Sequence, residues 1–422
     1  MVTAADQATR RDVAWATARR FAHASAEPAP PARTPLSRAA GLTLAEDLVA
    51  PTPLPAFDTS AMDGYAVAGD GPWTLTGSAR PGRPWPGERL ENGHAVEIST
   101  GAVVPAGAWA VLPIESATAD DRAGGRAGGR AGGRAGRRAD GSAGGRAGDG
   151  RVAGPALERG KHIRRAGEDT PAGASLAPAG TPVGPALLGL AASCGYDELL
   201  VRRAPAVRAI VTGDELAHHG LPAPGRVRDA LGPLLPSLIA ELGGHLADLV
   251  HVPDQPASAL AKAVDEPGAE VVVVTGSTSV GVTDGLRRLL AERDARWIVD
   301  SVASRPGHPA LLARPRGGPY VVGLPGNPFA ALTAAHTLLG PLLAGLSCRP
   351  LGVLPQAPLI SRVRAPAGRT RIVPVVWDGA GVRALGGDRP AFLNGAALGD
   401  ALAAVPHGHE PGGPVPLMLL RR

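Results

Sequence analysis

Cysteine is almost absent from this chain: its 422 residues include two, Cys194 and Cys348. The two lie far apart, and neither belongs to a Cys-x-x-Cys motif or a Cys/His cluster. A disulfide framework or a cysteine-based structural zinc site is therefore excluded as the basis of the fold. We expect both cysteines to pack in a hydrophobic core.

Long hydrophobic runs are also lacking in the sequence. No apolar run approaches the roughly 18 residues that a membrane-spanning helix needs, and residues 1–20 contain no apolar stretch of the signal-peptide type. Hydrophobic residues nevertheless make up 44% of the chain, which is enough to fill the cores of several domains. We therefore expect a multidomain cytoplasmic protein with no membrane partner.

Aromatic residues are scarce, at 3%, although the formal net charge is +5. The charge is concentrated in residues 122–151, where eight arginines face two aspartates, so this one segment accounts for the whole positive excess. A nucleic-acid-binding surface needs basic residues on folded elements, with aromatic platforms among them. We therefore expect no nucleic-acid partner, with an RGG-like RNA-binding role of this segment as the alternative.

The same segment is a glycine-rich repeat, since residues 123–138 repeat Ala-Gly-Gly-Arg. Glycine at this density does not recover the entropy lost on ordering. We therefore predict a disordered Arg/Gly loop at residues 120–151, inserted between two strands of a β domain.

The periodicity of the sequence changes along the chain. An amphipathic helix is expected at residues 6–27, and short segments broken by Pro and Gly predict a small β domain at 46–115. From residue 206, strands and helices alternate, which indicates a three-layer α/β domain with a mostly parallel sheet. The expected strands are 206–212, 245–252, 270–275 and 320–323, and the expected helices are 228–242, 257–264, 285–292 and 329–343.

The predicted fold class is therefore α/β and β multidomain. Four parts are expected: an elongated helical and β N-terminal domain at 1–45 and 160–203, an inserted β domain at 46–159, the α/β domain at 204–348, and a C-terminal β domain at 349–422.

Polar and glycine residues follow three of the predicted parallel strands. Ligands of open α/β sheets bind outside the carboxyl ends of the strands, and Gly/Ser/Thr loops before a helix suit phosphate groups. Helix capping and turn formation are the alternative roles for these residue types. The candidate binding residues are Thr212, Gly213, Gly276, Ser277, Thr278, Ser279, Gly281, Pro325, Gly326 and Asn327.

Three carboxylates accompany these loops: Glu215, Asp229 and Asp284. Carboxylates beside a phosphate cradle repel the ligand unless a cation lies between them, and magnesium prefers oxygen ligands. We therefore predict that these three residues bind Mg²⁺. For Asp229, capping of the following helix is the alternative.

Seven segments, in this order, resemble the MoeA family of molybdopterin molybdenumtransferases, whose eukaryotic relatives include the gephyrin E domain. The resemblance spans nearly the whole chain. The segments are PAFDTSAMDGYAV (55–67), ISTGAVVPAGAWAVLPIE (98–115), GKHIRRAGEDTPAG (160–173), VTGDEL (211–216), VTGSTSVGVTDG (274–285), RPGHP (305–309) and GLPGNPFAAL (323–332).

The resemblance implies a homodimer with its active site between subunits, acting in molybdenum cofactor biosynthesis. Molybdenum from molybdate is inserted into adenylylated molybdopterin, with magnesium-dependent release of AMP. The family's functional positions correspond here to Asp63, Thr100, Asp169, Glu215, Asp229 and Asp284. Arg305 and His308 are the expected anion-binding cations, and other cofactor-assembly proteins are expected partners.

The chain also departs from the family pattern. Where the family usually has Gly-Gly-x-Ser, residues 276–279 of this chain are Gly-Ser-Thr-Ser. Where the family usually has Lys-Pro-Gly-Lys, residues 305–308 are Arg-Pro-Gly-His. The usual Asp-x-Asn is 229–231, Asp-Ala-Leu, which lacks the amide. Two alternatives therefore stand beside the transferase: a weak or inactive paralog that binds molybdopterin or scaffolds cofactor assembly, and a molybdopterin adenylyltransferase.

Overall fold

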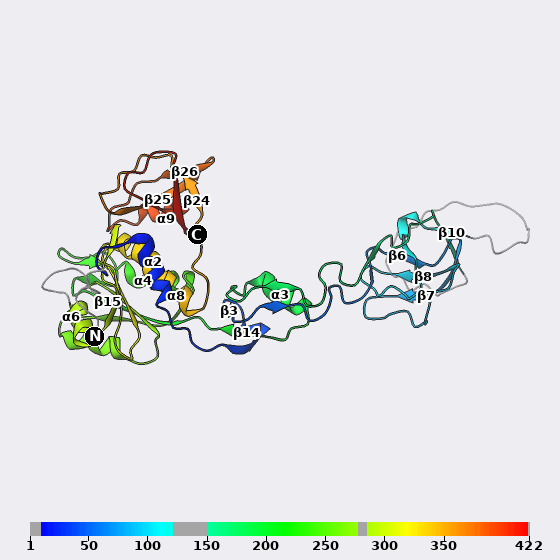
Figure 1. The fold of residues 1–422 in the computed structure, drawn as a ribbon, viewed down its shortest axis with the longest axis horizontal. Helices are drawn as coiled ribbons and strands as arrows, with labels where there is room; N and C mark the ends of the chain where they lie inside the picture. Colours follow the sequence, from blue (N-terminus) through cyan, green and yellow to red (C-terminus); the bar gives the residue numbers. More distant parts are fainter. Residues whose placement is uncertain (1–9, 121–149, 277–284, 421–422) are drawn as a thin grey trace, which may run out of the picture. The chain divides into compact units, whose positions relative to one another are not determined.

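The computed structural model describes residues 10–120, 150–276 and 285–420 (Figure 1). The chain forms two compact units. The first comprises Met1–Glu46, Pro178–Leu188 and Glu198–Arg422, and the second comprises Asp47–Ala177 and Gly189–Asp197. The four-part division expected from the sequence differs from these units, because its N-terminal part at 1–45 and 160–203 takes residues from both. This division stays a prediction.

The first unit contains a six-stranded sheet in the order β18-β15-β19-β23-β22-β20. The four strands from β18 to β23 are parallel, while β22 and β20 add an antiparallel edge. The predicted mostly parallel sheet is confirmed, and the antiparallel edge was not predicted. The bounds are β15 Ala206–Thr212, β18 His245–Val252, β19 Val271–Thr275, β20 Arg296–Val299, β22 Leu311–Arg314 and β23 Tyr320–Leu324.

Helices cover both faces of this sheet. Side chains of β19 alternate between two cores: Val271 and Val273 pack in one, and Val272 and Val274 in the other. All four are 0% exposed, as expected for a parallel strand covered on both sides. One core is covered by α2 (Trp15–Ala24), α4 (Leu231–Glu241), α7 (Pro328–Ala334) and α8 (Gly340–Leu346), and the other by α5 (Ala257–Asp265) and α6 (Gly285–Glu292).

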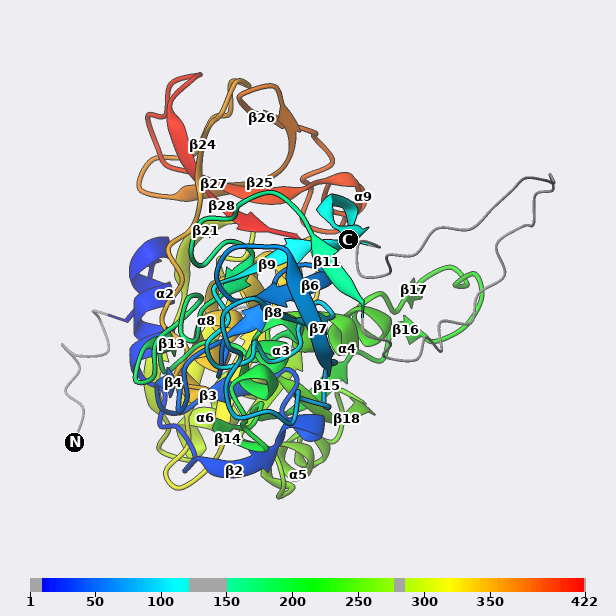
Figure 2. The same cartoon turned by 90° about the vertical axis from the view of Figure 1, so that its right-hand side faces the viewer.

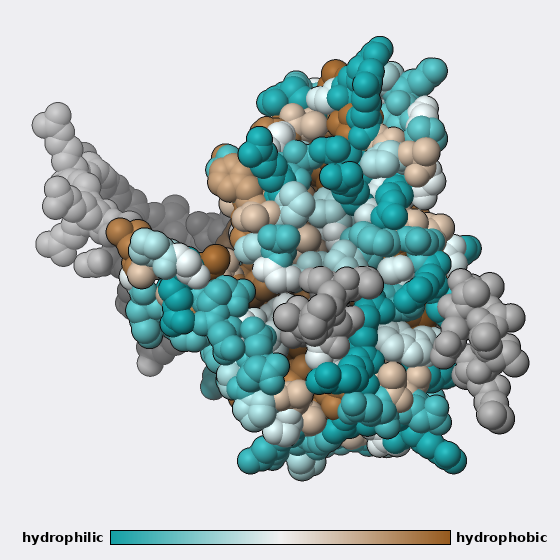
Figure 3. All heavy atoms as spheres, turned by 90° about the vertical axis from the view of Figure 1, so that its left-hand side faces the viewer, coloured by the Kyte–Doolittle hydropathy of each residue, from teal (hydrophilic) through white to brown (hydrophobic). Residues whose placement is uncertain are grey.

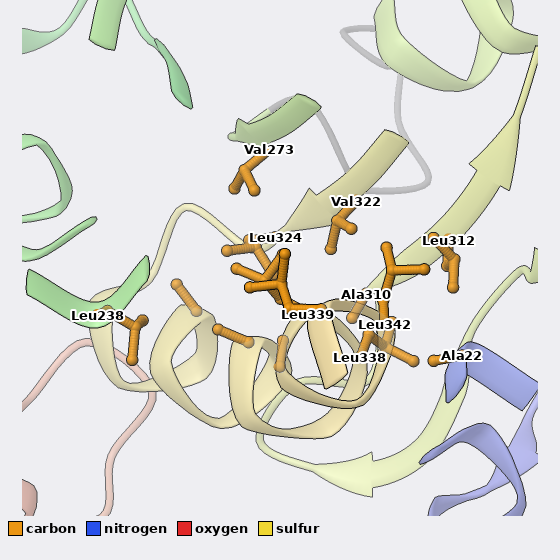
Figure 4. Close-up of a cluster of buried hydrophobic side chains, with 14 of the residues drawn as sticks. Ala22, Leu238, Val273, Ala310, Leu312, Val322, Leu324, Leu338, Leu339 and Leu342 are labelled. Carbon is orange, nitrogen blue, oxygen red and sulfur yellow. The ribbon is translucent and has the colours of Figure 1, made fainter. Parts of the chain in front are cut away.

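The helical run Pro328–Leu346 corrects the expectation that no apolar run reaches membrane-spanning length. It has 19 residues and a mean hydropathy of 1.5, but 89% of its apolar window is buried inside the protein. A π-helical turn, η3 (Ala335–Leu339), joins α7 to α8. Figure 4 shows Leu339 directed toward Leu324 of β23, and Leu338 and Leu342 pack in the same core. The apolar composition of this run is therefore that of a core helix.

Several predicted boundaries shift. The helix expected at 228–242 begins at Leu231, because β17 (Val227–Arg228) pairs in parallel with β16 (Leu216–Ala217) immediately before it. The helix expected at 6–27 is described over Trp15–Ala24. Cys194 is buried as expected, but Cys348 is exposed, because it lies in the turn after α8 with φ of 55°.

A seven-stranded sheet also belongs to the first unit, in the order β1-β21-β25-β27-β28-β24, with β26 paired to β25. The predicted C-terminal β region therefore shares its sheet with β1, from near the N-terminus, and with β21, which precedes β22. The bounds are β1 Val13–Ala14, β21 Val302–Arg305, β24 Gln356–Pro358, β25 Thr370–Asp378, β26 Gly381–Ala384, β27 Ala401–Val405 and β28 Pro414–Leu419, with a short α9, Asn394–Leu398. A smaller sheet joins β14 (Glu198–Arg202) to β2 (Ala32–Pro35) and β3 (Thr43–Leu44).

The second unit is built on a six-stranded sheet in the order β10-β11-β7-β8-β6-β9. The bounds are β6 Gly64–Val67, β7 Trp73–Ala79, β8 His94–Ile98, β9 Ala110–Pro113, β10 Thr118–Asp120 and β11 Arg151–Ala153. Two short strand pairs also belong to this unit: β4 (Leu48–Val49) with β13 (Ser175–Ala177), and β5 (Thr59–Ser60) with β12 (Ile163–Arg164). Helix α3 (Pro185–Ser193) is divided between the two units. The antiparallel pairing of β10 with β11 confirms that the Arg/Gly segment connects two strands, although residues 121–149 themselves lie outside the described chain.

The face drawn in Figure 3 is mostly hydrophilic, with apolar residues in small separate groups. This distribution is typical of a surface in contact with water. The apolar residues of the chain instead collect in the cores described above.

The buried His336 in the π-helical turn predicts a pH-dependent stability. Burial, and secondarily the charge of Arg19, lower the pKa of His336 to about 4 from 6.5. Between these values the unfolded chain takes up a proton that the folded protein does not. The free energy of unfolding should therefore fall by about 1.4 kcal/mol per pH unit as the pH drops below 6.5, until it passes the folded pKa.

Urea unfolding at pH 7 and pH 5 measures this effect. His336→Gln should remove most of the difference between the two pH values, whereas His245→Gln, at an exposed position of β18, should leave it unchanged. Equal pH dependence in His336→Gln and the unmodified protein would contradict the assignment.

Candidate functional site

The ends of three parallel strands meet at one edge of the six-stranded sheet. Thr212 ends β15, Gly276 follows β19, and Gly326 follows β23. A Cβ atom at Gly276 would lie 2.5 Å from Thr212 Oγ1, and one at Gly326 would lie 3.6 Å from the Gly276 Cα. The structure therefore brings together these predicted binding residues, as parallel strand order requires.

Glycine is needed at this edge for both conformation and space. Gly213 and Gly276 have φ of 142° and 81°, which side chains rarely adopt. The carboxylate of Glu215 lies against Gly213, where a Cβ atom would be 2.7 Å from Glu215 Oε2. The edge thus combines close backbone approaches with one of the predicted carboxylates.

A cavity of about 360 Å³ lies in the same unit, next to the end of β23. It contains four of the predicted binding residues, Arg305, His308, Pro325 and Asn327. Its other lining residues include Ser304, Gly307, Pro366, Arg369 and Pro390. Because 366, 369 and 390 lie in the C-terminal region, the cavity is assembled from distant parts of the chain.

The cavity is basic. Arg305 and Arg369 are permanent cations, and His308 can add a third charge. His308 Nδ1 lies 2.9 Å from the carbonyl oxygen of Val302 and therefore donates to it, so Nε2 is the nitrogen left for a ligand. Asp12 Oδ1 lies 3.3 Å from His308 Nδ1 and 3.6 Å from Arg369 Nη2. Three side chains that can carry positive charge thus face one carboxylate, and the positive excess suits an anion.

Asp229 is buried, at 6% exposure, and caps α4. Its Oδ1 accepts hydrogen bonds from the backbone N–H groups of Leu231 and Gly232, both at 2.9 Å. Burial raises the pKa of Asp229, but the hydrogen bonds from Gly232, His251 and Leu231 together lower it below its ordinary value. The carboxylate is therefore ionised at neutral pH.

The other oxygen of Asp229 faces two histidines. Oδ2 lies 2.9 Å from His251 Nε2 and 3.8 Å from His218 Nδ1. Among the described residues, these three side chains form the metal-capable group, and Glu215 is not part of it. Two of the donors beside Asp229 are therefore nitrogens, whereas magnesium favours oxygen ligands. That Glu215, Asp229 and Asp284 bind Mg²⁺ stays a prediction. The remaining predicted members Ser277, Thr278, Ser279, Gly281 and Asp284 lie outside the described residues.

The second unit holds the other predicted residues in two pairs. Asp63 Oδ1 accepts hydrogen bonds from the backbone N–H of Thr100 at 2.8 Å and from its hydroxyl at 3.2 Å. Asp169 Oδ2 accepts a hydrogen bond from Arg164 Nη2 at 2.7 Å, and both side chains are half exposed. Asp63 and Thr100 thus form one local cluster, and Asp169 belongs to another.

Comparison with known proteins finds two matching family models along the chain. Residues 13–195 match the model of the MoeA N-terminal region (domain I and II), and residues 208–345 match a probable molybdopterin binding domain. Molybdopterin molybdenumtransferase 2 of Mycobacterium tuberculosis (strain CDC 1551 / Oshkosh) is 32% identical over 377 residues, covering 82% of this chain and 84% of that protein. The chain belongs to the MoeA family of molybdopterin molybdenumtransferases.

Two further similarities support the family assignment. A molybdopterin molybdenumtransferase of Synechococcus elongatus is 32% identical over 372 residues, covering 82% of this chain and 84% of that protein. The solved structure of the molybdopterin biosynthesis moea protein from Pyrococcus horikosii is 26% identical, has a TM-score of 0.71, and covers 97% of this chain and 99% of that chain. The resemblance recognised in the seven sequence segments is confirmed.

The sequence analysis of this MoeA-family chain missed three residues: Arg369, which lines the basic cavity, and His218 and His251, which lie beside Asp229. Arg369 lies far along the chain from the other cavity residues, and His218 and His251 lie 11 and 22 positions from Asp229. No motif connects them. His251 did carry one signal: it is the penultimate residue of the expected strand 245–252, and ligands were expected to bind beyond the ends of these strands.

The basic cavity predicts anion binding. Arg305→Gln and Arg369→Gln should each weaken molybdate binding about 10- to 150-fold, because each removes one charge-assisted contact worth about 1.5 to 3 kcal/mol. Isothermal titration of the full chain with molybdate measures the effect. Arg33→Gln, at an exposed position of β2, is the matched control, and affinities equal to that control would show that molybdate binds elsewhere.

Proposed function

We propose that this chain inserts molybdenum from molybdate into adenylylated molybdopterin and releases AMP. The observation that carries the proposal is the basic cavity of Arg305, His308 and Arg369 in the same unit as the glycine-lined sheet edge. Both substrates are anions, one an oxyanion and the other a phosphate ester. Family membership supports the same activity, since the similar proteins are named for it.

The two features suit different parts of the substrates. At the sheet edge, Gly213, Gly276 and Gly326 follow the ends of three parallel strands, a position that favours phosphate groups of the adenylylated pterin. The cavity offers guanidinium groups and the Nε2 atom of His308, which favour a compact oxyanion such as molybdate. Pre-placed cations stabilise negative charge that develops when the pyrophosphate link breaks.

Magnesium, a homodimer and a cytoplasmic location belong to the same proposal. Magnesium is usually held by one or two carboxylates together with substrate phosphates, and Glu215 is the described carboxylate at the sheet edge. Asp63 and Thr100, joined by two hydrogen bonds, are proposed to come from the partner subunit. Asp169 is proposed to support binding through its pairing with Arg164.

Purified protein given adenylylated molybdopterin, molybdate and magnesium should release AMP. Glu215→Gln should lower kcat at least 100-fold without changing the midpoint of unfolding, because the carboxylate lies at an edge rather than in a core. Glu292→Gln, at the exposed end of α6, is the matched control. Asp284→Ala, chosen from the sequence, should likewise abolish turnover and keep the fold.

The outcomes separate the three candidate activities. No AMP release by the unmodified protein, with tight molybdopterin binding retained, would reject the transferase in favour of a binding or scaffolding paralog. Consumption of ATP in the presence of molybdopterin would reveal an adenylyltransferase instead. Complementation of a strain unable to insert molybdenum tests the same assignment in the cell.

A further inference from the structure

We propose that His218, Asp229 and His251 form a binding site for a divalent transition-metal ion of the zinc type. The ligands would be His218 Nδ1, Asp229 Oδ2 and His251 Nε2. This site is distinct in chemistry from the magnesium site expected from the sequence, although both use Asp229. The proposal does not depend on the proposed function, because metal binding needs neither molybdopterin nor molybdate.

Three strands of one unit bring the side chains together. His218 follows β16, Asp229 follows β17, and His251 lies near the end of β18. The parallel pairing of β16 with β17 holds the first two in register, and the Asp229 N–H donates to the Ala217 carbonyl oxygen at 3.0 Å. Figure 2 shows β16 and β17 at the periphery of the α/β region, near α4.

The distances suit a shared ion. The three ligand atoms all lie within 4.8 Å of one another, with Oδ2 at 2.9 Å from one imidazole nitrogen and 3.8 Å from the other. Nitrogen and oxygen atoms at about 2.0–2.2 Å from one tetrahedral metal lie about 3.3 Å apart, which falls between the two observed separations. The imidazole rings meet edge to face at a centroid distance of 4.2 Å, so both can turn a nitrogen toward one point.

Asp229 is held in place for this role by its surroundings. The backbone N–H groups of Leu231 and Gly232 engage Oδ1 and thereby direct Oδ2 to the histidines. Hydrogen bonds of this kind orient metal-binding carboxylates. The Asp229 side chain is 5% exposed, whereas those of His218 and His251 are 47% and 37% exposed. An ion can therefore enter from solvent and keep open positions for water or another ligand.

The ligand set selects the ion. Imidazole nitrogen favours zinc, cobalt, nickel and copper, whereas magnesium favours oxygen ligands. On binding, the ion replaces the proton that His251 Nε2 shares with Asp229, and this proton passes to solvent. The alternative is a metal-free pair in which the histidines only neutralise the buried carboxylate.

Titration of the full chain with Co²⁺, followed by its visible absorption, and with Zn²⁺, followed by calorimetry, tests the proposal. One ion per chain should bind, and a large excess of Mg²⁺ should not displace it. His218→Ala and His251→Ala should each weaken binding at least 10-fold. His219→Ala, which changes the adjacent exposed histidine outside the group, should leave the affinity unchanged.

Asp229→Asn keeps the proposal testable if other substitutions disturb folding, because an amide oxygen can still cap α4. This variant should fold normally and bind Co²⁺ at least 10-fold more weakly. The proposal would be overturned if His251→Ala left the Co²⁺ affinity unchanged, or if His219→Ala weakened Co²⁺ binding as much as His251→Ala does. Because the titrations contain no pterin substrate, failure of AMP release leaves their result intact, and failure of metal binding leaves the transferase proposal standing.

Discussion

Parallel pairing of β15, β19 and β23 is the interaction on which the rest of the first unit depends. Each strand must be covered on both faces, and the alternation of Val271 to Val274 between two cores shows how this is achieved. Covered parallel strands all end at the same edge. The glycine-rich turns after them are therefore neighbours, although they lie far apart in the sequence.

The first unit holds two different groups of charged side chains. The cations Arg305, His308 and Arg369 line one cavity, where Asp12 contacts two of them. Asp229 instead lies in a capping position, buried and shared with two histidines. An anionic substrate and a positively charged ion can thus be accommodated by different groups of the same unit.

Much of the fold could be predicted from periodicity, because strands such as His245–Val252 and helices such as Gly285–Glu292 carry strong local patterns. Less could be predicted of the short elements. β16 and β17 have two residues each, and their pairing moved the start of α4 to Leu231. These two strands are stabilised by contacts with other segments of the chain rather than by their own composition. No local sequence pattern therefore predicts them.

The sequence by itself determined the family, the alternating strands and helices, and the residue types that follow each strand, since motifs and periodicity are local properties. Only the tertiary structure decided which of these residues meet. It placed Arg369 beside Arg305, gave Asp229 two histidine neighbours, and left Glu215 outside that group. The physical reason is that contacts between distant segments depend on packing and strand order, which side-chain patterns within one segment do not encode.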